Sequence, residues 1–142
     1  MKARSIISIL ISISMILALV LCFASCEGGI KGDEAKATIN EFFAALASED
    51  YEKAESLLHP DRPADLEDFI KHVESRKSLD FSEGITIEKY TGISSSYYNS
   101  AVDGSTYGLD MKVKIGDTTA RISIELVKNE YGYGIYNFEI NL

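Results

Sequence analysis

The chain has 142 residues and carries 22 acidic against 14 basic residues, a net charge of −8. This length suits one domain of ordinary size and is too short for two. So acidic a chain lacks the clustered Lys and Arg that nucleic-acid binding requires, and no DNA or RNA partner is expected. The same acidity argues against electrostatic docking on anionic lipid.

The N-terminal segment has the layout of a secretory signal. Lys2 and Arg4 give a short positive start, and residues 5–25 follow with no charge and many Ile, Leu, Val, Ala and Ser residues. From Glu27 onward the chain becomes charged and rich in glycine. This order predicts that residues 1–25 are a signal peptide.

The end of that segment reads Phe23-Ala24-Ser25-Cys26. A cysteine after two small residues resembles the lipobox of bacterial lipoproteins, although Phe23 stands where Leu is usual. The resemblance implies that Cys26 is acylated, with palmitate as an expected chain, and becomes the new N-terminus on the extracytoplasmic side of the cell membrane. Two alternatives remain open. The length of the apolar run is close to the roughly 20 residues that span a bilayer, so the run could stay as an uncleaved anchor. The other alternative is that an ordinary signal peptidase removes it.

Processing at Cys26 would change what the rest of the chain can do. Residues 27–142 keep all 22 acids and 12 of the basic residues, a net charge of about −10. The sequence contains cysteine at positions 22 and 26 alone, so the exported part would have no disulfide, thiol nucleophile or cysteine-based metal site. We expect a lipidated cysteine and flexible tether over residues 26–33 and one domain over residues 34–142.

Apolar residues recur at helical spacing in three successive stretches. The first helix is expected over residues 34–47 with Asp33 as N-cap, the second from a Ser48 cap to His59, and the third from near Asp61 to residue 77 with Pro63 in its first turn. The apolar stripes are Ile39, Phe42, Phe43 and Leu46; Tyr51, Ala54, Leu57 and Leu58; and Leu66, Phe69, Ile70 and Val73.

Alternation of apolar and polar residues replaces the helical period after residue 77. Strands are predicted over residues 85–90, running toward Ile93, and over residues 97–102, 107–115, 120–126 and 136–142. Asp103-Gly104 predicts a two-residue hairpin turn and Gly116-Asp117 a second turn. Each strand has one apolar face, so the predicted fold is α+β, with three helices packed on one face of a curved, cone-like antiparallel sheet of four to five strands.

This order of elements resembles the nuclear transport factor 2-like superfamily, and two local motifs resemble small bacterial lipoproteins within it. The "F-x-x-A-L" and "G-D-Y-x-x-A" motifs of those proteins match residues 42–46 and 49–54, and their closing "G-x-W-x-I" matches residues 131–136 with Tyr133 in place of Trp and Gly134 where Lys is common. The resemblance covers residues 33–142 and implies the fold. Catalytic members place acids, His or Tyr inside the cone, and no matching constellation is found here.

Candidate catalytic and metal-binding residues are few. His59 precedes Pro60 and is expected to cap the second helix, and His72 lies beside the apolar stripe of the third helix and is expected to be exposed. The acids fall on polar helix faces, and no phosphate loop, nucleophile elbow or metal-binding motif occurs. We therefore assign no catalytic residue, no metal ligand and no cofactor.

Tyrosines cluster in the sheet half of the chain. Tyr combines an apolar ring with a polar tip, which suits binding surfaces, although it also simply favours strands. The expected binding face comprises Tyr97, Tyr98, Tyr107, Tyr133 and Tyr136.

The sequence as a whole favours a non-enzymatic lipoprotein of the cell envelope. Its expected partners are the membrane, through the N-terminal lipid, and either a small apolar ligand or another envelope protein. Two alternatives of other classes are an isomerase or dehydratase with a general base inside the cone, and a structural homodimer formed sheet to sheet.

Overall fold

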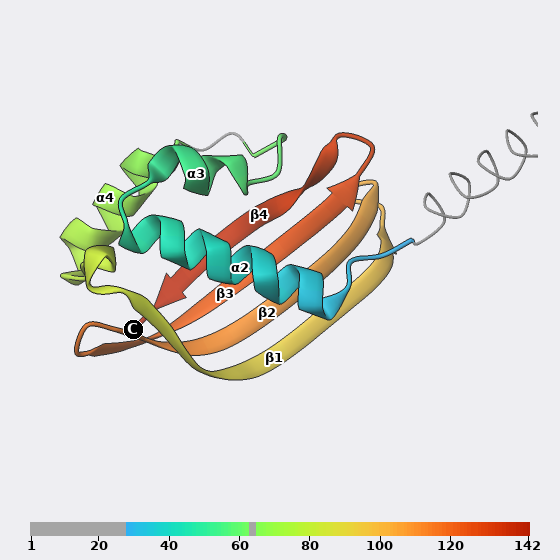
Figure 1. Ribbon diagram of the computed structural model, residues 1–142. Coiled ribbons are helices and arrows are strands. Elements are labelled where there is room, and N and C mark those ends of the chain that lie inside the picture. Colours follow the sequence, from blue (N-terminus) through green and yellow to red (C-terminus); the bar gives the residue numbers. More distant parts are fainter. Residues whose placement is uncertain (1–27, 63–64) are drawn as a thin grey trace, which may run out of the picture.

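The computed structural model describes residues 28–62 and 65–142. Three helices, α2 (Gly32–Ala47), α3 (Tyr51–Ser56) and α4 (Leu66–Lys77), precede a 3-10 turn, η1 (Phe81–Glu83). Four strands follow in an antiparallel sheet of order β1-β2-β3-β4, namely β1 (Ile85–Asn99), β2 (Gly104–Ile115), β3 (Thr118–Asn129) and β4 (Gly132–Asn141) (Figure 1). The predicted α+β class, with three helices and a curved antiparallel sheet, is confirmed.

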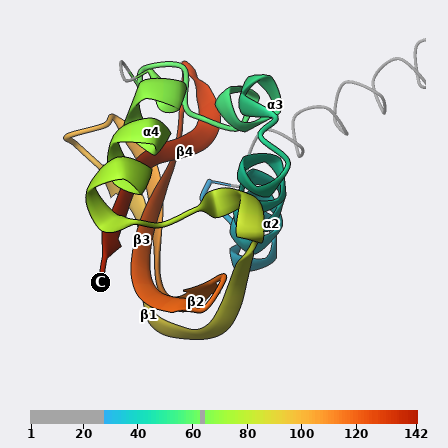
Figure 2. The ribbon, with the colours of Figure 1, turned by 90° about the vertical axis from the view of Figure 1, so that its left-hand side faces the viewer.

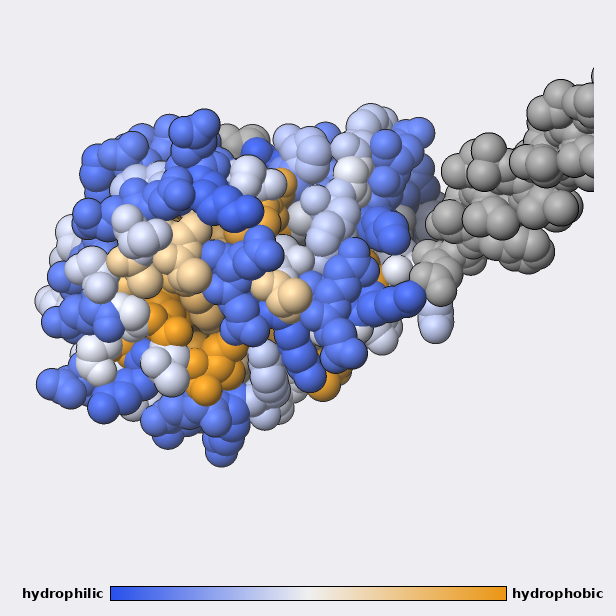
Figure 3. Space-filling view, viewed as in Figure 1, coloured by the Kyte–Doolittle hydropathy of each residue, from blue (hydrophilic) through white to orange (hydrophobic). Residues whose placement is uncertain are grey.

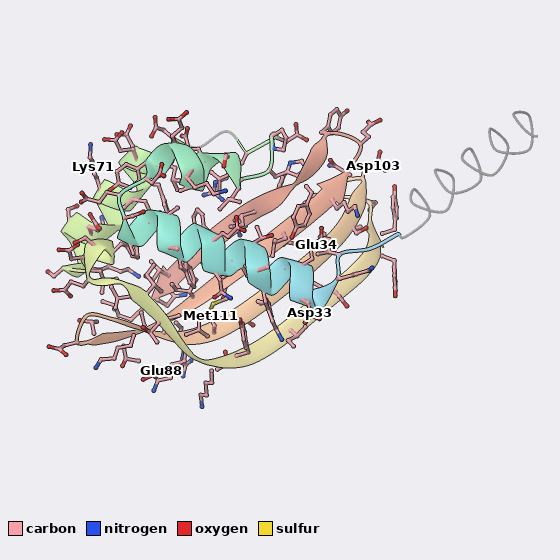
Figure 4. All side chains as sticks on the ribbon, in the orientation of Figure 1. Asp33, Glu34, Lys71, Glu88, Asp103 and Met111 are labelled. Carbon is pink, nitrogen blue, oxygen red and sulfur yellow. The ribbon has the colours of Figure 1, made fainter. Side chains whose placement is uncertain are left out.

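The helices lie on one side of the curved sheet, as the end-on view in Figure 2 shows. The predicted stripes of α2 and α4 supply the buried helical residues, and alternate residues of β2, β3 and β4 supply the other half of the core. Met111 of β2 lies beneath α2 in the middle of this layer (Figure 4). The opposite face of the sheet is polar, and there Lys112 pairs with Glu88 at 2.8 Å and the Ser123 hydroxyl donates to Asp110 at 2.6 Å.

Phenylalanines connect the helices to β4. The ring of Phe138 packs edge-on against Phe42 of α2, with centroids 5.6 Å apart, and against Phe69 of α4, with centroids 5.4 Å apart. Aromatic pairs of this geometry contribute about 0.5–1.5 kcal/mol beyond the burial of their area. The two helices are therefore held to the same strand residue.

The prediction of separate strands over residues 85–90 and 97–102 was wrong, because residues 85–90 and 97–99 belong to the single 15-residue strand β1 and residues 100–102 lie in the turn after it. Three register shifts interrupt the pairing of β1 with β2, between Ile87 and Lys89, Tyr90 and Gly92, and Ser96 and Asn99. Each bulge inserts an extra residue and breaks the alternation that a sequence reading follows. The two-residue hairpin was also misplaced: residues 100–103 make the turn, and Gly104 already pairs with Asn99.

The helix boundaries differ from the predicted ones at all three N-termini. Helix α2 begins two residues early, with Lys31 as N-cap and Asp33 in its first turn. The side chain of Asp50, not Ser48, caps α3 and accepts from the Lys53 amide at 3.0 Å. Asp65 caps α4, which begins at Leu66, and the predicted position of Pro63 lies outside the described residues.

The N-terminal segment enters the fold earlier than the predicted domain boundary. The signal peptide and Cys26 lie outside the described residues. Within them, Ile30 is buried in the core and α2 starts at Gly32, so the packed structure begins inside the segment expected to be a tether. In the part of the chain that the structure describes, no helix is long and apolar enough to cross a membrane.

Replacing Phe42 with Ala should destabilise the fold by about 3–5 kcal/mol, because the ring is fully buried and its loss leaves a cavity beside Phe138. Urea denaturation of residues 28–142, followed by circular dichroism, measures the change. Tyr97→Ala is the matched control: its ring is 84% exposed, and its removal should change the free energy of unfolding by less than about 0.5 kcal/mol. Equal destabilisation by the two variants would contradict this packing.

Candidate functional site

The β1–β2 and β3–β4 hairpins turn at the same end of the molecule, where the chain also enters α2 (Figure 1). We call this the hairpin end and define it by residues 28–31, 100–103 and 129–132. The side-chain nitrogen of Asn129, Nδ2, donates to the Val102 carbonyl at 2.8 Å and so joins the two turns. The C-terminus lies at the opposite end of the sheet.

An open cavity of about 410 Å³ lies at the hairpin end. Residues 28–31 form one wall, and residues 95–97 with Thr106 and Tyr107 form the other. Its volume falls in the range of small-molecule sites, roughly 300–1,000 Å³. The lining combines the aromatic rings of Tyr97 and Tyr107 with the hydroxyls of three Ser and Thr residues.

Two glycines allow the N-terminal segment to approach the tyrosines this closely. Gly29 has a φ of 136°, which L side chains rarely adopt, and a Cβ there would lie 3.0 Å from the Tyr97 ring. A Cβ at Gly32 would lie 2.7 Å from the Tyr107 hydroxyl. Larger residues at these positions would push the segment away and change the shape of the cavity.

The structure does not gather the five predicted tyrosines on one face. Tyr97 and Tyr107 share the cavity, and Tyr98 lies at the same end of the molecule with its hydroxyl on Asp103 at 2.8 Å. Tyr133 packs beneath α2, and Tyr136 packs against the ring of His59 with centroids 5.7 Å apart. The exposed aromatic surface at the hairpin end is therefore made by Tyr97 and Tyr98, together with Tyr131, which the sequence analysis did not select.

Tyr133 has a structural position between β4 and α2. The Thr38 hydroxyl donates to the Glu34 carbonyl at 3.0 Å, so the Tyr133 hydroxyl, 2.9 Å from Thr38 Oγ1, donates to it. Burial raises the pKa of Tyr133. The phenol is therefore neutral at physiological pH and serves to hold α2 on the sheet.

The tyrosines at the rim of the hairpin end lie beside carboxylates. The hydrogen bond to Asp103 and its negative charge raise the pKa of Tyr98. Glu130 raises the pKa of Tyr131 in the same way, with smaller effects from Asp61 and Asp103. Both phenols are consequently neutral, in an acidic part of the surface.

His59 has a different position from the predicted helix cap. Its ring is buried, with 2% of the residue exposed; Nε2 lies 3.0 Å from the Asn129 side-chain oxygen, and Nδ1 accepts from the Asp61 amide at 3.2 Å. The backbone around it pairs with β4: the His59 amide donates to the Ile135 carbonyl at 2.8 Å, and the Ile135 amide donates to the Leu57 carbonyl at 2.9 Å. Both ring nitrogens thus have structural partners.

Other polar groups give little sign of acid–base or metal chemistry in the described part of the chain. His72 is exposed, as expected. The buried polar side chains described are His59, Ser105 and Thr106, and the described residues contain no group of three or more His, Cys, Asp or Glu side chains placed to hold a metal ion. Burial lowers the pKa of Arg62, which donates to the Tyr136 carbonyl at 2.8 Å and lies over the Phe69 ring.

A second apolar area is visible away from the hairpin end. Figure 3 shows it where the C-terminal part of α2 faces the start of β1, within a surface that is otherwise mostly hydrophilic in this view. The half-buried residues Ile85, Ile87 and Tyr90 of β1 pack against the core in this region. Unlike the hairpin end, this area has no polar groups of described residues arranged around a cavity.

Comparison of the chain with protein-family models, with curated proteins and with solved structures gives no match. The resemblance to the nuclear transport factor 2-like superfamily therefore remains a prediction. The site is characterised by its own geometry: an open cavity, an aromatic rim and hydroxyl groups beside the N-terminal segment.

Replacing Asn129 with Ala should destabilise the domain by about 1–3 kcal/mol, because the His59 ring and the Val102 carbonyl each lose a partner. In the Asn129→Ala variant, the rate of backbone amide hydrogen exchange should increase most at residues 100–103, since Asn129 joins the two turns. Asn40→Ala, at an exposed position on α2, is the control and should leave exchange at these turns unchanged. Equal exchange rates at these turns in the Asn129→Ala and Asn40→Ala variants would show that Asn129 does not organise the hairpin end.

Proposed function

We propose that this protein is a lipid-anchored lipoprotein of the extracytoplasmic membrane surface that binds a small apolar ligand without catalysing a reaction. The observation that carries the proposal is the cavity of about 410 Å³ at the hairpin end. One of its walls, residues 28–31, begins two residues after Cys26, so anchoring and binding would involve adjacent parts of the chain.

The chemistry of the lining supports an apolar ligand with a polar group. Ile30 and the rings of Tyr97 and Tyr107 offer apolar contact, and the hydroxyls of Ser95, Ser96 and Thr106 can orient a polar end. Among the described residues that line the cavity, none is a carboxylate or a histidine, and Lys31 is the charged residue. This composition favours binding over general acid–base catalysis.

The alternatives have weaker support. An isomerase or dehydratase needs a base that can reach its substrate, whereas the buried His59 has both ring nitrogens held by Asn129 and the Asp61 amide. A sheet-to-sheet dimer would bury the polar outer face that carries the Lys112–Glu88 ion pair. An envelope protein is the second candidate ligand, because the exposed rings of Tyr97 and Tyr98 suit a protein interface as well.

The superfamily of the fold and the export signal are both inferred from the sequence. The helices beside a curved meander sheet are compatible with the cone of the nuclear transport factor 2-like superfamily, whose catalytic members place their site residues inside the cone. Here that space contains Phe42, Phe43 and Met111, and the cavity lies at the end of the sheet instead. We infer that the ligand site of this chain uses the hairpin end.

Lipidation can be tested by mass spectrometry of the full chain purified from bacterial membranes. The wild type should lack residues 1–25 and carry acyl groups on Cys26, whereas Cys26→Ser should carry none and keep its signal peptide. Cys22→Ser is the control and should be processed like the wild type. A wild-type chain with residues 1–25 retained and Cys26 unmodified would support the uncleaved anchor, and a different free N-terminus would support ordinary cleavage.

Ligand binding can be tested with a neutral fluorescent probe, N-phenyl-1-naphthylamine, on residues 28–142. Ser95→Phe fills the cavity and should weaken binding at least about tenfold, which corresponds to roughly 1.4 kcal/mol. Ser75→Phe adds the same ring at an exposed position on α4 and should leave the Kd unchanged. No binding by the wild type, or equal binding by both variants, would remove the cavity as the ligand site.

A further inference from the structure

We propose that the hairpin end lies directly on the bilayer to which the N-terminus is anchored, with Tyr97 and Tyr98 at the level of the lipid headgroups. This inference rests on the membrane anchoring proposed above. It adds an interaction surface and its partner: the partner is a lipid bilayer with uncharged headgroups, and the contact is made by the hairpin end and the strand residues next to it.

The first step is the short reach of the chain between the anchor and the fold. Cys26 precedes the buried Ile30 by four residues, and four extended residues span at most about 14 Å. An uncleaved anchor ending at Ser25 would add one residue to that span. Because Ile30 is packed in the core at the hairpin end, this end must stay close to the membrane.

The second step is the length of the molecule. Strand β2 runs from the hairpin end to the far end of the sheet over 12 residues, a distance of about 40 Å. The far end, where the C-terminus lies, cannot reach the membrane surface without the hairpin end also lying near it (Figure 1). The anchor therefore restricts which face of the domain meets the lipid.

The third step is the kind of side chain found there. Tyr97 is 84% exposed, Tyr98 63% and Tyr131 61%, and all three belong to the hairpin end or the strand residues next to it. Tyrosine is enriched at membrane–water interfaces because its ring favours the apolar boundary and its hydroxyl favours water. Such exposed rings suit the surface that the short N-terminal segment brings to the bilayer.

The charges at this end select the lipid. Asp33 and Glu34 in the first turn of α2 lie at the same end as Asp103 (Figure 4). Acidic residues outnumber basic ones among the described residues in and beside the hairpin end. The acidic residues are Asp33, Glu34, Asp61, Asp103 and Glu130, and the basic ones are Lys31, Arg62 and Lys128. Anionic headgroups would repel this surface, whereas uncharged headgroups would accept it. The anchor supplies the affinity, and the tyrosines set the orientation.

Depth-dependent fluorescence quenching tests the proposal, because the chain contains no tryptophan and a single substitution provides a unique reporter. Full-length Tyr97→Trp is purified from bacterial membranes and reconstituted into phosphatidylcholine vesicles that carry a spin label near the headgroup. Leu142→Trp is the matched control, since Leu142 is an exposed apolar residue at the far end. Flotation of the vesicles reports anchoring separately.

If the hairpin end lies on the bilayer, the label should reduce the tryptophan emission of the Tyr97→Trp variant about twofold and leave that of the Leu142→Trp variant nearly unchanged. Replacing part of the phosphatidylcholine with phosphatidylglycerol should reduce the quenching of the Tyr97→Trp variant.

Three outcomes would overturn parts of the proposal. If the Tyr97→Trp variant floats with the vesicles but its emission is not quenched, the docking is overturned and the anchoring stands. The exposed tyrosines would then be assigned to a protein partner. Equal quenching of the Tyr97→Trp and Leu142→Trp variants overturns the orientation. A chain that does not float overturns the proposed anchoring together with the docking.

Discussion

The structure depends on one contact, the packing of Phe138 against both Phe42 and Phe69. A meander sheet with one apolar face is unstable in water until something covers that face, and here two helices far apart in the chain meet on the same residue of β4. With α2 held on the sheet, its first turn lies beside Tyr107, and Gly32 leaves room for the Tyr107 hydroxyl. The contact on the edge strand β4 thus helps to hold α2, which begins beside the cavity at the hairpin end.

The fold could be predicted from the sequence wherever burial on one side imposes a period. The stripe through Ile39, Phe42 and Leu46 and the alternation in residues 107–115 predicted a helix and a strand that the structure confirms. Prediction failed where the backbone departs from its period, as at the three bulges of β1. The starts of the second and third helices were misplaced because Ser48 and Asp61 have the same capping chemistry as Asp50 and Asp65, whose side chains accept the capping hydrogen bonds.

The site was less predictable, because it depends on which distant segments meet. Residue type alone identified Tyr97 and Tyr107, but strand register decides that they line a cavity whereas Tyr133 packs under α2. The role of His59 could not be read from its neighbours in sequence, since it depends on the pairing of residues 57–59 with Ile135. The cavity itself needs residues 28–31, whose glycines read locally as a tether and which the fold uses as a wall.

The bulges of β1 and the pairing of Leu58 with β4 would have a consequence for copies of this protein held in one membrane by the proposed anchor. A sheet has two edges, and an unpaired edge strand can recruit another chain, which is most dangerous when anchoring confines many copies to one plane. Here the bridge between Leu58 and Ile135 occupies part of the β4 edge. The β1 edge is irregular at three places and carries the exposed Lys89 between two of them. Irregular, charged edges pair poorly, so crowding of many copies would not by itself favour edge-to-edge aggregation.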